Sequence, residues 1–159
     1  MHRLSPIVVI ALSILILVAL FGCRKESEEE TIKNILTGIQ TAAEEKSTSS
    51  IMKHVSENYK DPQGTTHDSL KKLLSSYFLI YPKISVHLNY IQVSVSGASA
   101  SARFQALLTS GQRKGSISDV IPDSLGVYRF NVSLEKQPGK WKIISANWES
   151  VNRESDAGE

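Results

Sequence analysis

The chain has 159 residues, of which 41% are hydrophobic and 21% are charged, a balance typical of one globular domain. Its 18 lysines and arginines against 16 aspartates and glutamates leave a net charge of +2, with no basic stripe interleaved with aromatics. The charge therefore gives no indication of nucleic-acid binding. A single cysteine excludes an internal disulfide, and no Cys/His spacing indicates a metal, so we expect no cofactor.

The N-terminus has the pattern of a secretion signal that ends at the cysteine. A basic start is followed by an apolar run over residues 7–22, shorter than the about 20 residues that a spanning helix needs. The stretch "LFGC" at residues 20–23 resembles the lipobox of bacterial lipoproteins, whose cysteine receives a lipid before cleavage. We therefore expect residues 1–22 to be a signal peptide and Cys23 to carry acyl chains such as palmitate. An uncleaved membrane anchor with an incidental cysteine is the alternative.

The residues on either side of the domain predict the membrane to which it is attached and the boundaries of the domain. Arg24 follows the cysteine, which in Gram-negative lipoproteins favours the outer membrane over the inner one. We expect an envelope protein anchored by lipid to the periplasmic face of the outer membrane. Residues 23–30 are then the acylated cysteine and a flexible charged linker, residues 31–150 the domain, and residues 151–159 a disordered tail.

Three helical patterns open the domain. Apolar residues at i, i+3 and i+4 spacing predict helices over residues 31–45, 51–59 and 70–81. The "DPQG" stretch at residues 61–64 is typical of a turn. Thr65, three residues before an aspartate, has the spacing of a capping box for the third helix.

From residue 84 onward the apolar period changes to two, which predicts strands. The four strands are expected at 84–95, 98–108, 128–134 and 141–149, with a long polar connection over 109–125 and a tight hairpin turn at "QPGK", residues 137–140. The phase slips at Tyr90-Ile91 and at Ile143-Ile144, which indicates β-bulges. Helices followed by strands favour the α+β class: three helices packed on a strongly bent four-stranded antiparallel sheet.

These elements resemble the nuclear-transport-factor-2-like superfamily, which includes SnoaL-type and ketosteroid-isomerase-like proteins. The resemblance depends on the element order, on "HVSENYKDPQGTTHDSLKKLL" and on the closing hairpin "VYRFNVSLEKQPGKWKIISANWE", and it covers Thr31–Glu149. It implies a cone-shaped barrel with a pocket at one end, and a short strand near Gly64–Thr66. The superfamily includes isomerases, dehydratases, cyclases and dimerising scaffolds, so the resemblance alone does not decide the chemistry.

Strand parity predicts which side chains point into the cone. If the face of Ala98–Leu108 that carries the alanines packs on the helices, the inward strand residues are aromatic and include no carboxylate. The pocket candidates are Tyr59, Asp61, Tyr90, Phe104, Tyr128, Phe130 and Trp148. Asp61 is the weak catalytic candidate, because a carboxylate in an apolar pocket can serve as a base. The alternative is an aspartate that only holds its own turn together.

The opposite face of the sheet is expected to be polar. His87, Arg103, Gln105, Arg129 and Asn131 could lie together across three strands, with Glu135 as a counter-charge. A homodimer or a protein partner could cover this face, or it could simply face water. We therefore expect a membrane-anchored, non-catalytic binding domain for a small apolar ligand in the cone or a protein partner on the sheet. The alternatives are an isomerase-like or dehydratase-like enzyme with Asp61 as base, and a purely structural envelope protein.

Overall fold

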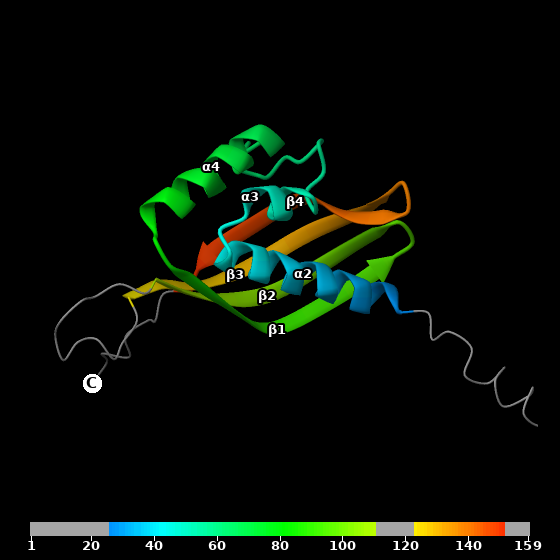
Figure 1. The fold of residues 1–159 in the computed structure, drawn as a ribbon. Coiled ribbons are helices and arrows are strands. Elements are labelled where there is room, and N and C mark those ends of the chain that lie inside the picture. The colour runs from blue at the N-terminus through cyan, green and yellow to red at the C-terminus, as the bar shows by residue number, and fades with distance from the viewer. Residues whose placement is uncertain (1–25, 111–122, 152–159) are drawn as a thin grey trace, which may run out of the picture.

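The computed structural model describes residues 26–110 and 123–151 (Figure 1). The expected signal peptide, Cys23 and nearly all of the expected tail lie outside these residues. The described elements are helices α2 (Glu28–Glu44), α3 (Thr48–Met52) and α4 (His67–Ile80) and strands β1 (Ile84–Ser96), β2 (Ser99–Ser110), β3 (Asp123–Gln137) and β4 (Lys140–Ser150). The strands form one antiparallel sheet in the order β1-β2-β3-β4, which confirms the α+β class.

Helix α2 begins at Glu28, inside the segment that we expected to be a flexible linker. Ser27 is its N-cap, and Ser27 Oγ accepts a hydrogen bond from the Glu30 backbone N–H at 3.1 Å. The acidic residues Glu28–Glu30 occupy the first turn, where negative charge interacts favourably with the positive end of the helix dipole. The linker prediction is therefore wrong at this end, because the acidic run is the start of the helix.

Helix α3 is shorter than predicted and ends at Met52. Beyond it the chain pairs with β4: the Ile143 N–H donates to the His54 carbonyl at 2.8 Å, and the Ser56 N–H donates to the Ile143 carbonyl at 2.9 Å. These hydrogen bonds replace the ones that a longer helix would make. They also hold the segment from His54 to Asp61 along the edge of the sheet.

The turn at Asp61–Gly64 is confirmed. The Gly64 N–H donates to the Asp61 carbonyl at 3.0 Å, and Gly64 has φ +85°, a backbone conformation that glycine adopts without strain. The cap of α4 is Thr66 rather than Thr65, one residue later than predicted. The short strand that the resemblance implies here is a single antiparallel bridge between Lys60 and Thr66.

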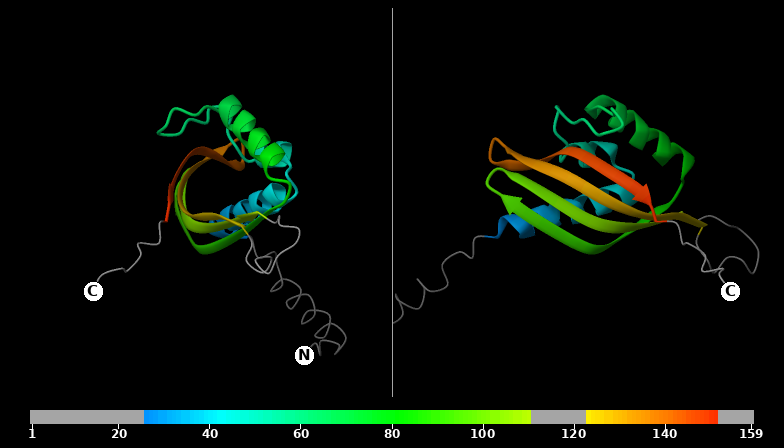
Figure 2. Two further views of the ribbon diagram at one scale, coloured as in Figure 1. Left: turned by 90° about the vertical axis from the view of Figure 1, so that its left-hand side faces the viewer. Right: turned by 180° about the vertical axis from the view of Figure 1, so that it is seen from behind.

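The sheet bends where the apolar phase slips in the sequence. The register of β1 on β2 shifts between Asn89 and Gln92, and the register of β3 on β4 shifts next to Ser133, opposite Ile144. Both predicted bulges are confirmed, and a third shift beside Leu108 was not predicted. Figure 2 shows the result, a sheet that curls around the helices as in the expected cone.

The core lies between α2 and the concave face of the sheet. Ile32 on α2 and Leu134 on β3 have exposed fractions of 0%, and small residues on β2 such as Ala102 let the helix approach closely. The alanines and Phe104 of β2 are buried while Ser101 and its outward neighbours are exposed, so the predicted inward face is confirmed.

Candidate functional site

Asp61 lies inside the molecule rather than at a solvated rim. Its side chain is only 4% exposed, and Oδ1 accepts a hydrogen bond from the Thr65 N–H at 2.7 Å, while the Asp61 N–H donates to the Thr65 carbonyl at 3.1 Å. Asp61 therefore does hold its own turn together. The second oxygen, Oδ2, is buried and has no hydrogen-bond partner among the described residues. That is unusual for a carboxylate, because buried polar atoms are nearly always paired.

Tyr59, two residues before Asp61, presents a second unpaired oxygen. Its side chain is 2% exposed and belongs to the central core, but its hydroxyl has no hydrogen-bond partner in the part of the chain that the structure describes. Burial, followed by the negative charge of Asp61, raises the pKa of Tyr59 to about 12, and the backbone of Ala146 on β4 opposes this only in part. A hydrogen-bonding interaction with the Asp61 side chain raises this pKa further, although neither Asp61 nor Ala146 meets the geometry of a normal hydrogen bond to the hydroxyl.

Three of the predicted pocket aromatics form a row across the sheet. Phe104, Phe130 and Trp148 are cross-strand partners on β2, β3 and β4. The rings of Phe104 and Phe130 stack with centroids 5.1 Å apart and planes at 8°, and the Phe130 and Trp148 rings are 6.2 Å apart at 29°. Tyr128, one inward position farther along β3, is half-buried opposite Ala106. The interior therefore offers flat apolar surface, as strand parity predicts.

The prediction that Tyr90 points into the cone is wrong. Its side chain is 77% exposed, because Tyr90 is the residue at the β1 bulge and has φ +56°. A bulge inserts one residue into the alternation, and that residue takes neither the inward nor the outward direction of its neighbours. The sequence signal located the bulge correctly but assigned Tyr90 to the wrong side of it.

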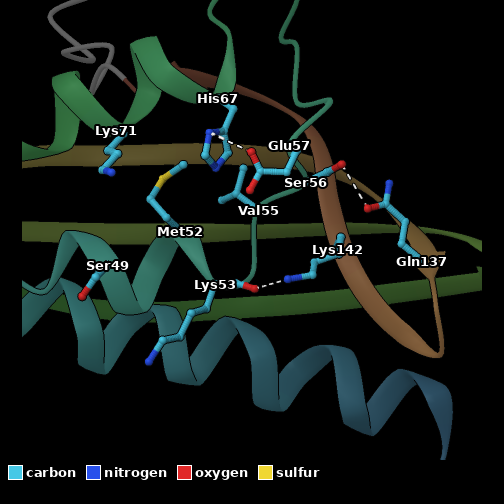
Figure 3. Close-up of a pocket in the computed structure, with 10 residues that line it drawn as sticks. All are labelled: Ser49, Met52, Lys53, Val55, Ser56, Glu57, His67, Lys71, Gln137 and Lys142. Atoms are coloured by element: carbon cyan, nitrogen blue, oxygen red, sulfur yellow. Dashed lines mark hydrogen bonds and ion pairs between the residues drawn. The ribbon is translucent and has the colours of Figure 1, made fainter.

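Two hollows in the described part of the chain lie elsewhere. One, of about 380 Å³, opens where α3, α4 and β4 meet (Figure 3). The other, of about 690 Å³, lies between the start of α2 and the β3–β4 hairpin. Neither is lined by Tyr59, Asp61 or the aromatic row. Lysine side chains line both, and no sequence motif had singled these lysines out.

The outward sheet face is polar. His87, Arg103, Arg129 and Asn131 are exposed and Gln105 is half-buried. Gln105 lies opposite Arg129 and Arg103 opposite Asn131, so four of these five residues form one group on β2 and β3. His87 sits farther along β1, opposite Leu107.

Within the described chain, Arg129 pairs with a carboxylate other than Glu135. Arg129 Nη1 lies 2.7 Å from Glu149 Oε1, not near Glu135. Arg129 and Glu149 are cross-strand partners on β3 and β4, and directly opposed opposite charges attract. Arg129 is thus already neutralised, and both members of this pair are more than a third exposed, so its contribution to stability is small.

Two further observations concern only residues 26–110 and 123–151. No helix in these ranges is both long enough and apolar enough to cross a membrane. In the same ranges, no group of three or more His, Cys, Asp and Glu side chains is placed to hold a metal ion.

The fold is similar to that of several solved structures. No protein-family model matches the sequence, and no curated protein matches it. A candidate scytalone dehydratase from Novosphingobium aromaticivorans has 18% identity and a TM-score of 0.67, with 79% of this chain and 85% of that chain covered. An NTF2-like protein with a cystatin-like fold from the same species has 12% identity and a TM-score of 0.63, with 96% and 95% covered.

A third similar structure, Bd1075 from Bdellovibrio bacteriovorus, has 16% identity and a TM-score of 0.62. The match covers 77% of this chain but only 40% of Bd1075. At these identities the comparisons establish the architecture: the chain has the nuclear-transport-factor-2-like α+β cone fold. The fold is compatible with ligand binding, and its neighbours include proteins of unknown function, candidate dehydratases and a candidate aromatic ring hydroxylase.

Proposed function

We propose that the domain binds a small, largely apolar ligand inside the cone, with the Tyr59 hydroxyl and the Asp61 carboxylate as its polar contacts. One observation carries the proposal: Tyr59 Oη and Asp61 Oδ2 are buried and have no hydrogen-bond partner among the described residues. Each such unpaired group costs roughly 1–3 kcal/mol of folding free energy. The Asp61 side chain interacts with the Tyr59 hydroxyl without giving either atom a hydrogen bond of normal geometry, and a ligand placed between them would complete the hydrogen bonds of both.

The chemistry of Tyr59 and Asp61 indicates which functional group the ligand must carry. With its pKa raised to about 12, Tyr59 stays protonated at neutral pH and donates a hydrogen bond, whereas an ionised Asp61 can only accept one. A ligand hydroxyl can accept from the first and donate to the second. The Phe104–Phe130–Trp148 row favours a flat ring system beside that hydroxyl.

The proposal includes attachment to the cell envelope through Cys23. Each buried CH₂ of an acyl chain contributes about 0.8 kcal/mol, so several chains hold a protein firmly at a membrane. We expect Cys23→Ser to move the protein from the membrane fraction to the soluble fraction of cells that process lipoproteins. A Cys23→Ser protein that still fractionates with membranes would contradict the lipid anchor and leave the ligand site untouched.

A matched pair of tyrosine variants tests the ligand site. We expect Tyr59→Phe to weaken ligand binding about tenfold or more, because it removes one buried hydrogen bond. It should leave the free energy of unfolding unchanged or raise it, since the lost hydroxyl pairs with nothing in the described part of the protein. Tyr90→Phe removes the same atom from an exposed ring and should change neither quantity.

The measurement is native mass spectrometry of the full chain released from detergent micelles, combined with denaturant unfolding. Wild type and Tyr90→Phe should carry the same small-molecule adduct, and Tyr59→Phe should lose it. If Tyr59→Phe kept the adduct, or if it lowered the free energy of unfolding by more than about 1 kcal/mol, the hydroxyl would have a structural role instead.

Acid–base catalysis is the second candidate function. The specific observation that favours it is a carboxylate beside a protonated tyrosine in an apolar interior, an arrangement that can remove a proton and donate a hydrogen bond to the same substrate. Solved structures with this fold include candidate dehydratases. Asp61 would be the base and Tyr59 the hydrogen-bond donor.

A further inference from the structure

Five lysines line the two hollows, and Lys136 is paired with Glu28; we call the other four, Lys53, Lys71, Lys140 and Lys142, the lysine trough. Lys53 and Lys142 line both hollows, Lys71 lines the smaller one and Lys140 the larger one. The trough therefore runs from α4, past the end of α3, to the β3–β4 hairpin. It is separate from the proposed site in the cone, because neither Tyr59 nor Asp61 lines it.

The charges of the trough are uncompensated. Among the described residues, none forms a salt bridge with the four lysines of the trough. Lys142 Nζ donates a hydrogen bond to the Lys53 backbone carbonyl, which leaves its charge unpaired (Figure 3). Lys53, Lys71 and Lys140 are exposed, so water screens their mutual repulsion, and an anion between them would lower it further.

Three glutamates also line the hollows, and each is engaged with another group. Glu28 Oε1 lies 2.6 Å from Lys136 Nζ, and Glu28 Oε2 accepts from the Trp141 indole N–H at 2.5 Å. Glu57 points toward His67, with 3.7 Å between Glu57 Oε2 and His67 Nδ1, and its side chain is 90% exposed. Glu26 accepts a hydrogen bond from Asn34.

His54 is half-buried on the wall of the larger hollow, and its pKa is affected by the positive charges of the trough. Burial, followed by the charges of Lys142 and Lys53, lowers the pKa of its imidazole. A neutral imidazole adds a hydrogen-bonding group to the hollow without adding a further positive charge. The hydroxyls of Ser49 and Ser56 and the amide of Gln137 line the smaller hollow as further polar groups.

We propose that the lysine trough binds a phosphate group, carried either by a soluble phosphorylated compound or by the headgroup of an anionic phospholipid. Lysine ammonium groups bind phosphate as point charges from several directions, and three or more of them can surround one tetrahedral anion. Met52 and Val55 give the smaller hollow an apolar floor for the rest of the ligand. This site is independent of the ligand site in the cone.

The test uses the full chain in micelles of a neutral detergent and inorganic pyrophosphate as the probe. We expect calorimetric titration to detect binding, and the double variant Lys53→Gln/Lys140→Gln to weaken it about tenfold or more, because each charged hydrogen bond lost is worth at least that factor. The control Lys72→Gln/Lys83→Gln removes the same charge from two exposed lysines outside the hollows and should bind within about twofold of wild type.

Lysine acetylation followed by peptide mass spectrometry distinguishes the two sources of phosphate. Protection of Lys53 and Lys140 by pyrophosphate supports a soluble ligand. Protection only in nanodiscs of phosphatidylglycerol, and not in nanodiscs of phosphatidylcholine, supports a lipid headgroup. The proposal is overturned if neither protects these lysines, or if the double variant and the control lose pyrophosphate affinity equally.

Discussion

Asp61→Asn is expected to keep the fold and to disable the ligand site. The asparagine amide oxygen can still accept the hydrogen bond from the Thr65 N–H, so the turn before α4 should survive. The carboxylate charge is lost, and we expect ligand affinity to fall about tenfold or more, because a charge-assisted hydrogen bond is replaced by a neutral one. If the domain is an enzyme, turnover should fall by about 10²–10⁴-fold, the contribution of a general base.

Tyrosine absorbance during a pH titration gives a direct readout of this change. Without the Asp61 charge, the pKa of Tyr59 should fall from about 12 toward its ordinary value, although burial still raises it. Asp68→Asn is the matched control, since that carboxylate is exposed at the start of α4 and contacts only His67 among the described residues. A Tyr59 titration that is the same in Asp61→Asn as in wild type would show that the two groups do not interact.

The raised pKa of Tyr59 also makes stability depend on pH in a defined window. The unfolded chain loses the tyrosine proton near pH 10, whereas the folded protein keeps it to about pH 12. The stabilising contribution is therefore complete below pH 10 and is lost as the pH rises to 12, at up to about 1.4 kcal/mol of unfolding free energy per pH unit. The slope due to this group should disappear in Tyr59→Phe.

Leu134→Ala is expected to destabilise the domain strongly, whether or not a ligand is bound. Leu134 is 0% exposed near the C-terminal end of β3, beside the bulge, and belongs to the same core cluster as Ile32 of α2. Removing three buried carbons there should lower the free energy of unfolding by about 2–5 kcal/mol. Leu79→Ala makes the same chemical change on α4 at a side chain that is 86% exposed, and its effect should stay within about 0.5 kcal/mol. Urea unfolding followed by circular dichroism measures both.

An equal effect of the two leucine variants would mean that the core does not lie between α2 and the sheet. A large effect of Leu79→Ala alone would place a partner on α4. The comparison therefore tests the packing of the cone independently of any ligand.

The sheet could be predicted from the sequence because the alternation of apolar residues that defines each strand lies within that strand. Alternation identified the inward face of β2, and a slip of one residue located the bulges at Tyr90 and Ile144. The early end of α3 could not be predicted in this way. It depends on hydrogen bonds between His54, Ser56 and Ile143, which are far apart in the sequence. Periodicity predicts which face of an element is buried. It does not predict which backbone groups will form hydrogen bonds with a strand that is distant in the sequence.

The candidate site was predicted only in part, for the same reason. Asp61 and the aromatic row were named from a turn motif and from strand parity, but the burial of Asp61 beside Tyr59 depends on how the segment before α4 packs on β4. Tyr90 was misplaced because parity does not define a direction at a bulge. The lysine trough carried no sequence signal at all, since Lys53, Lys71 and Lys142 come together only in the folded chain.

If Cys23 carries a lipid, the early start of α2 limits how far the domain can move from the membrane. An extended residue spans at most about 3.6 Å, so the five steps from Cys23 to Glu28 reach no more than about 18 Å. The ion pair between Glu28 and Lys136 places the β3–β4 hairpin beside the start of α2, where this short linker ends. A chain attached at Cys23 would therefore present the hairpin end of the cone to the lipid and could not reach partners beyond roughly one domain diameter. It would act on molecules that come to the bilayer surface.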